Sequence, residues 1–306
     1  MFVFSRCSGW VLLGSLLFCS GFLSAAENIR IEKEIIYKQV GDQQLQLDLA
    51  RPADNRKCPA IVFIHGGGWA LGHRTKYLSQ IQEAAKQGYV AVTISYRLMK
   101  FEMDEKDTAI AEPHFPAQIH DVKAAVRWLR LNADKYQIDA DHIGAIGDSA
   151  GGHLSLMLGL ADSEAELEGE TENPEVSSQV QAVVNFYGPT EMQACYEASS
   201  VAWLMRLFMG GTPAEQPGNY VASSPVQYIK STSPPVLTFQ GELDRLVPIA
   251  QARLLDQKMN DAGASHTLVV YPTQKHGFDQ EHKQKSKVQM YEFFDQHLKA
   301  KPAPVE

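Results

Sequence analysis

The sequence predicts an α/β protein in which helices cover both faces of a mostly parallel sheet. Short and continuously apolar runs, such as residues 60–64 (AIVFI), are typical of strands that are buried on both faces. They alternate along the chain with segments whose apolar residues recur every three or four positions, which is the period of a helix. Because a helix that links two neighbouring strands makes them parallel, this alternation favours a parallel sheet.

The first elements depart from this pattern. Apolar and polar residues alternate around Ile35 and Tyr37 and again through residues 45–49, and a Gly-Asp pair separates the two stretches. This pattern predicts an antiparallel hairpin at one edge of the sheet.

The later elements follow in order. A helix with Leu78, Ile81 and Ala85 on one side ends at Gly88, a residue type that favours a helix end. Strands are expected at residues 60–64, 90–94, 142–146, 180–186, 236–239 and 268–271, and further helices around residues 119–129, 154–160, 254–259 and 290–298.

Composition indicates one ordinary globular domain. Of the 306 residues, 44% are hydrophobic and 21% are charged, with a formal net charge of −8. An acidic chain lacks the basic face that nucleic-acid binding requires, and it gains no attraction to anionic lipid. No linker rich in Pro, Gly or Ser divides the chain. We therefore expect neither a nucleic-acid partner nor stable membrane insertion of the mature chain.

The N-terminus has the pattern of a secretory signal peptide. Residues 1–26 carry one charge, Arg6, then an apolar run at 10–18, then small residues that end at Ala26. We expect cleavage after Ala26, a mature domain of residues 27–306, and a secreted or periplasmic location. An uncleaved anchor is disfavoured because the run is short and broken by glycines, whereas a span needs about 20 apolar residues. A lipoprotein signal at Cys19 is disfavoured by the bulky residue before it.

Cysteine use does not indicate a metal site. Cys7 and Cys19 lie in the leader, so Cys58 and Cys195 remain. Export permits a disulfide between them, but sequence cannot place their Cα atoms within bridging distance. Two buried, unpaired thiols are the favoured interpretation. Four cysteines without paired spacings do not form a zinc framework, and no cofactor is expected.

Two stretches interrupt the alternation of strands and helices. Residues 162–175 are crowded with glutamates, which indicates a solvated, mobile loop more than a calcium or other cation site. Residues 199–230 are long and contain an apolar helical segment at 203–209. We expect this second stretch to form a cap over the C-terminal edge of the sheet.

The hexapeptide GDSAGG follows a predicted strand and precedes a predicted helix, which is the context of a nucleophile elbow. A Cβ atom at Gly147 or Gly151 would collide with the neighbouring strand and helix in so tight a turn. Ser149 then stands at a helix N-terminus, where backbone N–H groups favour developing negative charge. The alternative is a glycine-rich turn, such as a phosphate site, with an incidental serine. Asp148 is expected to be buried and hydrogen-bonded, and Gly152 to allow close helix packing.

The motif HGGGW at residues 65–69 follows the 60–64 strand, at the sheet edge where ligands bind. Its glycines allow the main chain to turn N–H groups towards a substrate. We expect the N–H groups of Gly67, Gly68 and Ala150 to form an oxyanion hole. His65 is expected to be a positioning residue beneath this loop, in preference to a base or a metal ligand.

An acid and a base follow later strands. Asp244 lies in GELDRLVP, after the 236–239 strand, and His276 lies in KHGF, after the last strand. The order Ser149, Asp244, His276 is the one expected for a catalytic triad on a sheet of this type. Asp244 as a helix N-cap is the plainer alternative, and the competing carboxylates are Glu242, Asp256 and Asp279.

Taken together, these ordered motifs, with LDLARP, SYRL, DVKAAVRWLR and FYGP between them, cover essentially the whole mature chain. The chain resembles the α/β-hydrolase superfamily, in particular the HGGG-bearing esterases related to hormone-sensitive lipase and the acetyl/feruloyl esterase-like hydrolases. The resemblance implies an eight-stranded, mostly parallel sheet with cap or lid insertions, and ester hydrolysis without a metal or cofactor. It implies Ser149 as nucleophile, His276 as base and Asp244 as its orienter. The cap segments match none that we can assign.

The expected function is a secreted serine carboxylic-ester hydrolase that cleaves short-chain acyl esters through an acyl-enzyme. Export suggests acetyl or feruloyl groups on plant polysaccharide, with Trp69 and Trp203 as substrate-pocket candidates that stack on sugar rings or line an acyl pocket. The alternatives are a general short-chain carboxylesterase or lipase without a carbohydrate role, and a non-catalytic binding protein of the same fold. The sequence leaves the acyl length, the alcohol and the oligomeric state open.

Overall fold

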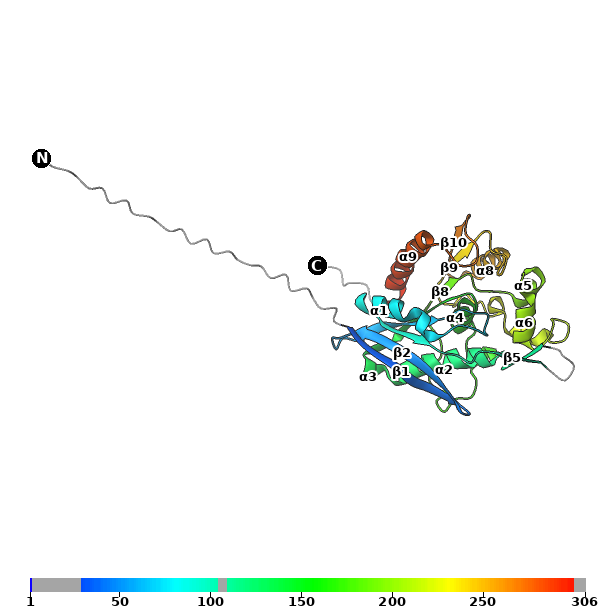
Figure 1. Ribbon diagram of the computed structural model, residues 1–306, viewed down its shortest axis with the longest axis horizontal. Coiled ribbons are helices and arrows are strands. Elements are labelled where there is room, and N and C mark those ends of the chain that lie inside the picture. Colours follow the sequence, from blue (N-terminus) through cyan, green and yellow to red (C-terminus); the bar gives the residue numbers. More distant parts are fainter. Residues whose placement is uncertain (2–28, 104–108, 300–306) are drawn as a thin grey trace.

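The computed structural model describes residues 1, 29–103 and 109–299 (Figure 1). The expected signal peptide, its cleavage site after Ala26, and Cys7 and Cys19 lie outside these residues. Within the described ranges, Cys58 and Cys195 are both buried and free, as predicted. No helix there is long and apolar enough to cross a membrane.

Eight strands form the main sheet, in the order β1-β2-β4-β3-β7-β8-β9-β10. The predicted hairpin, β1 (Ile29–Val40) and β2 (Gln43–Pro52), is antiparallel and lies at one edge, and β2 pairs antiparallel with β4 (Val90–Ile94). All later pairs are parallel. They join β4 to β3 (Cys58–Ile64), β7 (Ile138–Asp148), β8 (Ala182–Phe186), β9 (Val236–Gly241) and β10 (His266–Tyr271). The mostly parallel sheet is therefore confirmed.

Each face of the sheet packs against its own helices. Along β3, Val62 and Ile64 belong to one apolar cluster, whereas Ile61 and Phe63 belong to another, because successive side chains point to opposite faces. The first cluster includes residues of α2 (Ala117–Leu131), α3 (Ala133–Tyr136), α4 (Ala150–Leu160) and α8 (Ala250–Asp261). The second includes residues of α1 (Leu78–Lys86) and α9 (Gln280–Leu298).

The segment between β8 and β9 forms the predicted cap. It contains α5 (Met192–Ala198), α6 (Ala202–Met209), α7 (Pro217–Ala222) and the short 3-10 turn η3 (Pro225–Gln227). Leu204 of α6 packs directly on the HGGGW loop, since a Cβ atom on Gly68 would lie 2.1 Å from its Cδ2. The cap therefore covers the sheet edge where β3 ends.

A second hairpin lies beside the cap and was not predicted. It consists of β5 (Lys100–Met103) and β6 (Ala109–Glu112). In Figure 1, β5 lies on the same side of the molecule as α5 and α6. The Phe115 N–H donates to the Phe208 carbonyl at 2.9 Å, which ties the segment after β6 to α6.

The glutamate-rich segment is largely exposed, as expected, but one of its glutamates, Glu168, anchors it to the domain. It begins with the 3-10 turn η2 (Ser163–Ala165). The Glu168 carboxylate accepts a hydrogen bond from Lys123 Nζ at 2.7 Å and also pairs with Arg127. The Lys123 side chain has no exposed surface. No group of three or more potential ligands able to hold a metal ion occurs among the described residues.

Candidate active site

The serine of GDSAGG stands on a sharp turn between β7 and α4. Ser149 has φ 54° and ψ −120°, a conformation that non-glycine residues rarely adopt. A Cβ atom on Gly147 would lie 2.3 Å from the Gly151 carbonyl oxygen, and one on Gly151 would lie 2.1 Å from the Ile64 carbonyl oxygen. The steric reason predicted for both glycines is confirmed. Gly152 is also confined, because a Cβ atom on it would lie 2.5 Å from Asn185 Oδ1.

Three side chains from different strand ends form a hydrogen-bonded chain. His276 Nε2 lies 3.0 Å from Ser149 Oγ, and His276 Nδ1 lies 2.7 Å from Asp244 Oδ2. Asp244 is 5% exposed, and its other oxygen accepts the backbone N–H groups of Leu246 and Val247. A carboxylate on Nδ1 holds the proton there, so Nε2 is free to accept the serine proton. The structure thus brings the three predicted residues together.

The competing carboxylates bind elsewhere. Glu242 pairs with Arg253 at 2.9 Å, and Asp256 lies 2.7 Å from His266 Nδ1. Asp279 is the N-cap of α9, and hydrogen bonds from the first turn of that helix lower its pKa to about 2. Each of these acids therefore has a structural partner outside the triad.

The HGGGW loop lies beside the serine. The φ angles of Gly67 and Gly68 are +123° and +59°, which glycine adopts readily. The Gly66 N–H donates to Asp148 Oδ1 at 3.0 Å. Among the hydrogen bonds of the described residues, none uses the N–H of Gly67, Gly68 or Ala150. These three N–H groups therefore have no hydrogen-bond acceptor within the described part of the chain.

His65 lies beneath the loop, as expected. Its ring is 1% exposed and stacks on Tyr96 at a centroid distance of 4.5 Å. Its Nδ1 lies 2.8 Å from the Gly66 carbonyl, and the Tyr96 hydroxyl donates to the His65 carbonyl. Burial lowers the pKa of His65 and favours a neutral ring. These contacts fix the start of the loop.

Asp148 joins the serine turn to this loop. Besides Gly66, its carboxylate accepts hydrogen bonds from Tyr77 Oη and Lys76 Nζ, both at 2.6 Å. Burial raises the pKa of Asp148, but the Lys76 charge and the hydrogen bonds outweigh it, so the pKa is lowered and the group stays ionised. The two partners come from the 3-10 turn η1 (Arg74–Tyr77). Sequence reasoning expected a hydrogen-bonded Asp148 without finding these partners.

Tyr187 was not singled out from the sequence. Its ring lies 4.7 Å from the His276 ring, and its backbone has φ 41°. Burial raises the pKa of Tyr187, so its phenol is neutral. Tyr187 belongs to the FYGP motif. The position of this motif after a predicted strand was the sequence signal that could have placed Tyr187 near the site.

The two tryptophan candidates differ in exposure. Trp69 is 3% exposed and stacks on Phe208 at 4.1 Å, so its ring faces are closed to a sugar. This corrects the expectation of a sugar-stacking surface at Trp69. Trp203 is 57% exposed, and its ring lies 6.4 Å from that of Phe101.

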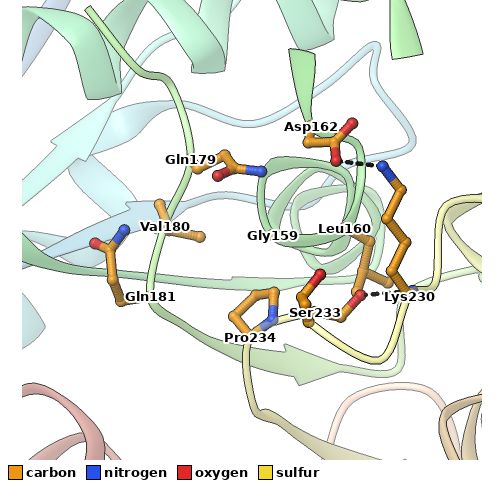
Figure 2. Close-up of a pocket in the computed structure, with 10 residues that line it drawn as sticks. Gly159, Leu160, Asp162, Gln179, Val180, Gln181, Lys230, Ser233 and Pro234 are labelled. Carbon is orange, nitrogen blue, oxygen red and sulfur yellow. Dashed lines mark hydrogen bonds and ion pairs between the residues drawn. The ribbon is translucent and has the colours of Figure 1, made fainter. Parts of the chain in front are cut away.

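A cavity of about 250 Å³ lies at the far end of α4 from Ser149 (Figure 2). Its lining includes the ion pair between Asp162 and Lys230 at 2.6 Å, with Gln179 and Ser233 close by. Because α4 has 11 residues, this cavity is roughly 16 Å from the serine. It is separate from the triad.

A sharp strand–serine–helix turn, with an acid and a histidine after later parallel strands, defines an α/β-hydrolase. The chain belongs to the BD-FAE family, whose model matches residues 47–259.

Individual relatives are esterases. The chain is similar to esterase LipC of Mycobacterium tuberculosis, with 32% identity over 250 residues, covering 78% of this chain and 58% of LipC. A truncated carbohydrate esterase from gut microbiota has a similar structure, with a TM-score of 0.72, 27% identity, and coverage of 88% of this chain and 98% of that one. Propionate-bound Est2 of Thermogutta terrifontis also matches, with a TM-score of 0.72, 27% identity, and coverage of 90% and 97%.

Proposed function

We propose that the chain is a serine carboxylic-ester hydrolase that cleaves short-chain acyl esters through an acyl-enzyme. The observation that carries the proposal is the chain of hydrogen bonds from Ser149 through His276 to Asp244, with distances of 3.0 and 2.7 Å. A serine hydroxyl is a weak nucleophile without such a base. The similarity to esterases supports the same reaction class.

In the first step, Ser149 Oγ bonds to the ester carbonyl carbon while His276 Nε2 takes the hydroxyl proton. Asp244 stabilises the imidazolium that forms and keeps the ring in its orientation. The carbonyl oxygen becomes an oxyanion, which the N–H groups of Gly67, Gly68 and Ala150 bind. Each such donor is worth roughly 3–4 kcal/mol in the transition state.

The tetrahedral intermediate then collapses. The C–O bond to the alcohol breaks, and the alcohol oxygen takes the proton from His276. Water attacks the acyl-enzyme with His276 again as base, and the acid leaves as Ser149 Oγ regains its proton. No cofactor enters this scheme.

Two observations support the proposal of short acyl groups. Leu204 packs against Gly68, so the cap limits the space above the proposed oxyanion hole. Est2, a structural relative, is bound to propionate. We propose acetyl or feruloyl groups on plant polysaccharide as the natural substrates, and a carbohydrate esterase among the structural relatives supports the carbohydrate part of this proposal. The leader at residues 1–26 would export the domain of residues 27–306 to reach such polymers.

The reaction class is tested with Ser149→Ala and a chromogenic acetyl ester. We expect kcat to fall by about 10⁴-fold or more, because removing the nucleophile leaves only the oxyanion hole and binding. Ser155→Ala is the matched control, since Ser155 lies on the same helix and its hydroxyl binds the Gly151 carbonyl. It should retain activity. Near-wild-type turnover by Ser149→Ala would overturn the proposal.

The substrate class is tested with an acyl series from acetate to octanoate, alongside acetylated xylan and a feruloyl ester. We expect kcat/KM to fall with acyl length and acetate to be released from xylan. Activity on small esters without release from xylan would favour the general carboxylesterase.

A further inference from the structure

The HGGGW loop ends in an unfavourable backbone conformation. Three consecutive residues, Gly67, Gly68 and Trp69, have positive φ angles, and that of Trp69 is 58°. A bulky side chain rarely adopts this region. Since a relaxed Trp69 would rotate the preceding peptide groups, contacts of its side chain must hold the loop in place.

Trp69 is held by one backbone contact and by two contacts of its ring. Its carbonyl accepts the Met99 N–H at 2.9 Å. Its ring stacks on Phe208 of the cap at 4.1 Å, with an interplanar angle of 4°. Its indole Nε1–H donates to His153 Nδ1 at 3.3 Å. The third contact is the one that connects the loop to the helix that follows Ser149.

His153 has a single protonation state in this arrangement. The ring has no exposed surface, and its Nε2 lies 2.7 Å from the Ser223 carbonyl in the cap. A carbonyl can only accept, so Nε2 carries the hydrogen, and Nδ1 then offers its lone pair to Trp69. Protonating Nδ1 would place two N–H donors against each other. Burial also lowers the pKa of His153 to about 4, which keeps the ring neutral.

The backbone places His153 next to the nucleophile. Its N–H donates to the Ser149 carbonyl at 2.9 Å, in the first turn of α4. His153 therefore lies on the helix that follows Ser149, and its side chain contacts both the end of the HGGGW loop and the cap.

We propose that His153 is a positioning residue that holds the N–H groups of Gly67 and Gly68 in line with Ser149 by accepting the indole N–H of Trp69. The contact with Ser223 orients the imidazole for this task. The inference rests on the proposed esterase function, because it concerns donors that act on the oxyanion.

Two substitutions at one position separate the two hydrogen bonds. His153→Asn keeps an acceptor oxygen near the position of Nδ1 and loses the bond to Ser223. His153→Gln keeps a donor near the position of Nε2 and loses the acceptor for Trp69. A third variant, Trp69→Phe, keeps an aromatic ring opposite Phe208 and removes the indole N–H together with part of the buried indole ring.

We expect His153→Gln and Trp69→Phe to lower kcat by about 10- to 100-fold with KM within about twofold, because misplaced oxyanion donors weaken only the transition state. The double variant should be no worse than either single one, since both remove the same contact. His153→Asn should stay within about threefold of wild type. His266→Asn is the control: it alters another buried histidine, on β10, and should lower only the melting temperature.

Equal kcat losses in His153→Asn and His153→Gln would overturn the inference, as would melting-temperature changes without a loss of kcat. Either result leaves the esterase proposal intact if Ser149→Ala is inactive. An activity-independent measurement is the ¹H–¹⁵N resonance of the Trp69 indole. We expect it to exchange slowly with solvent in wild type and rapidly in His153→Gln. Rapid exchange in both would also overturn the inference.

Discussion

Gly151 is a position in the serine turn where the backbone leaves no room for a side chain, and Gly151→Ala is therefore a sharp test of the site geometry. A Cβ atom there would lie 2.1 Å from the Ile64 carbonyl oxygen and 2.7 Å from that of His65. Ordinary contacts begin at 3.4 Å, so the separation between the start of α4 and the end of β3 must grow by about 1 Å. Both obstacles are backbone atoms, so no side-chain rotation relieves the clash.

This displacement moves Ser149 relative to the HGGGW loop, because Ile64 directly precedes that loop. A misplacement of about 1 Å costs on the order of 100-fold in rate, and overpacking a rigid site costs about 1–3 kcal/mol of stability. We expect Gly151→Ala to lower kcat for a chromogenic acetyl ester by about 100-fold and to reduce the free energy of unfolding by about 2 kcal/mol.

Steady-state kinetics and urea unfolding measure the two effects. Gly218→Ala is the matched control, since nothing lies within 4 Å of its Cβ position in α7, so it should keep wild-type kcat and equal or higher stability. Wild-type kcat and stability in Gly151→Ala would refute the steric account of the serine turn.

Three further predictions concern titratable side chains. Asp244→Asn should lower kcat by about 10³- to 10⁴-fold, because an amide no longer holds the proton on Nδ1. Asp279→Ala should change only the melting temperature, and steady-state kinetics compares the two variants. Because the pKa of His153 falls from 6.5 to about 4 on folding, the unfolded chain binds more protons between these pH values. Stability should therefore drop by about 3 kcal/mol as the pH falls from 6.5 to 4. Urea unfolding at several pH values should show a weaker dependence in His153→Gln, and an identical slope would contradict the assignment. Finally, Glu168→Gln should cost about 2–3 kcal/mol of stability with kcat unchanged, because it removes the carboxylate that binds both the buried Lys123 amine and Arg127. Unchanged thermal unfolding would show that this pair does not anchor the loop.

Elements with strong local patterns were predictable from the sequence. The apolar run at 90–94 is β4 in full, because a glycine turn precedes it and polar residues follow it. β7 is longer than the predicted 142–146 stretch, because polar residues near Asp139 hide its first half and a bulge shifts its pairing with β3. The hairpin of β5 and β6 has only four residues in each strand and no clear alternation, so local pattern did not indicate it.

The grouping of Ser149, Asp244 and His276 was predictable because each residue lies in the segment after a parallel strand, and parallel strands end at the same edge. Contacts between segments that are far apart in the sequence were not predictable. Lys76 and Asp148 are 72 residues apart, and the turn that joins them has no sequence signal. The stacking of Phe208 on the ring of Trp69 joins two segments that are far apart in the sequence, so no local pattern indicates that the ring is closed to a sugar.

We propose that Ser149 is the nucleophile of an acyl-enzyme. This proposal is tested most directly by treating the full chain with a fluorophosphonate ester and locating the adduct by peptide mass spectrometry. We expect one adduct, on Ser149, with loss of esterase activity in proportion to labelling and no adduct in Ser149→Ala. Labelling at another residue, or full hydrolytic activity with Ser149 unmodified after treatment, would contradict it.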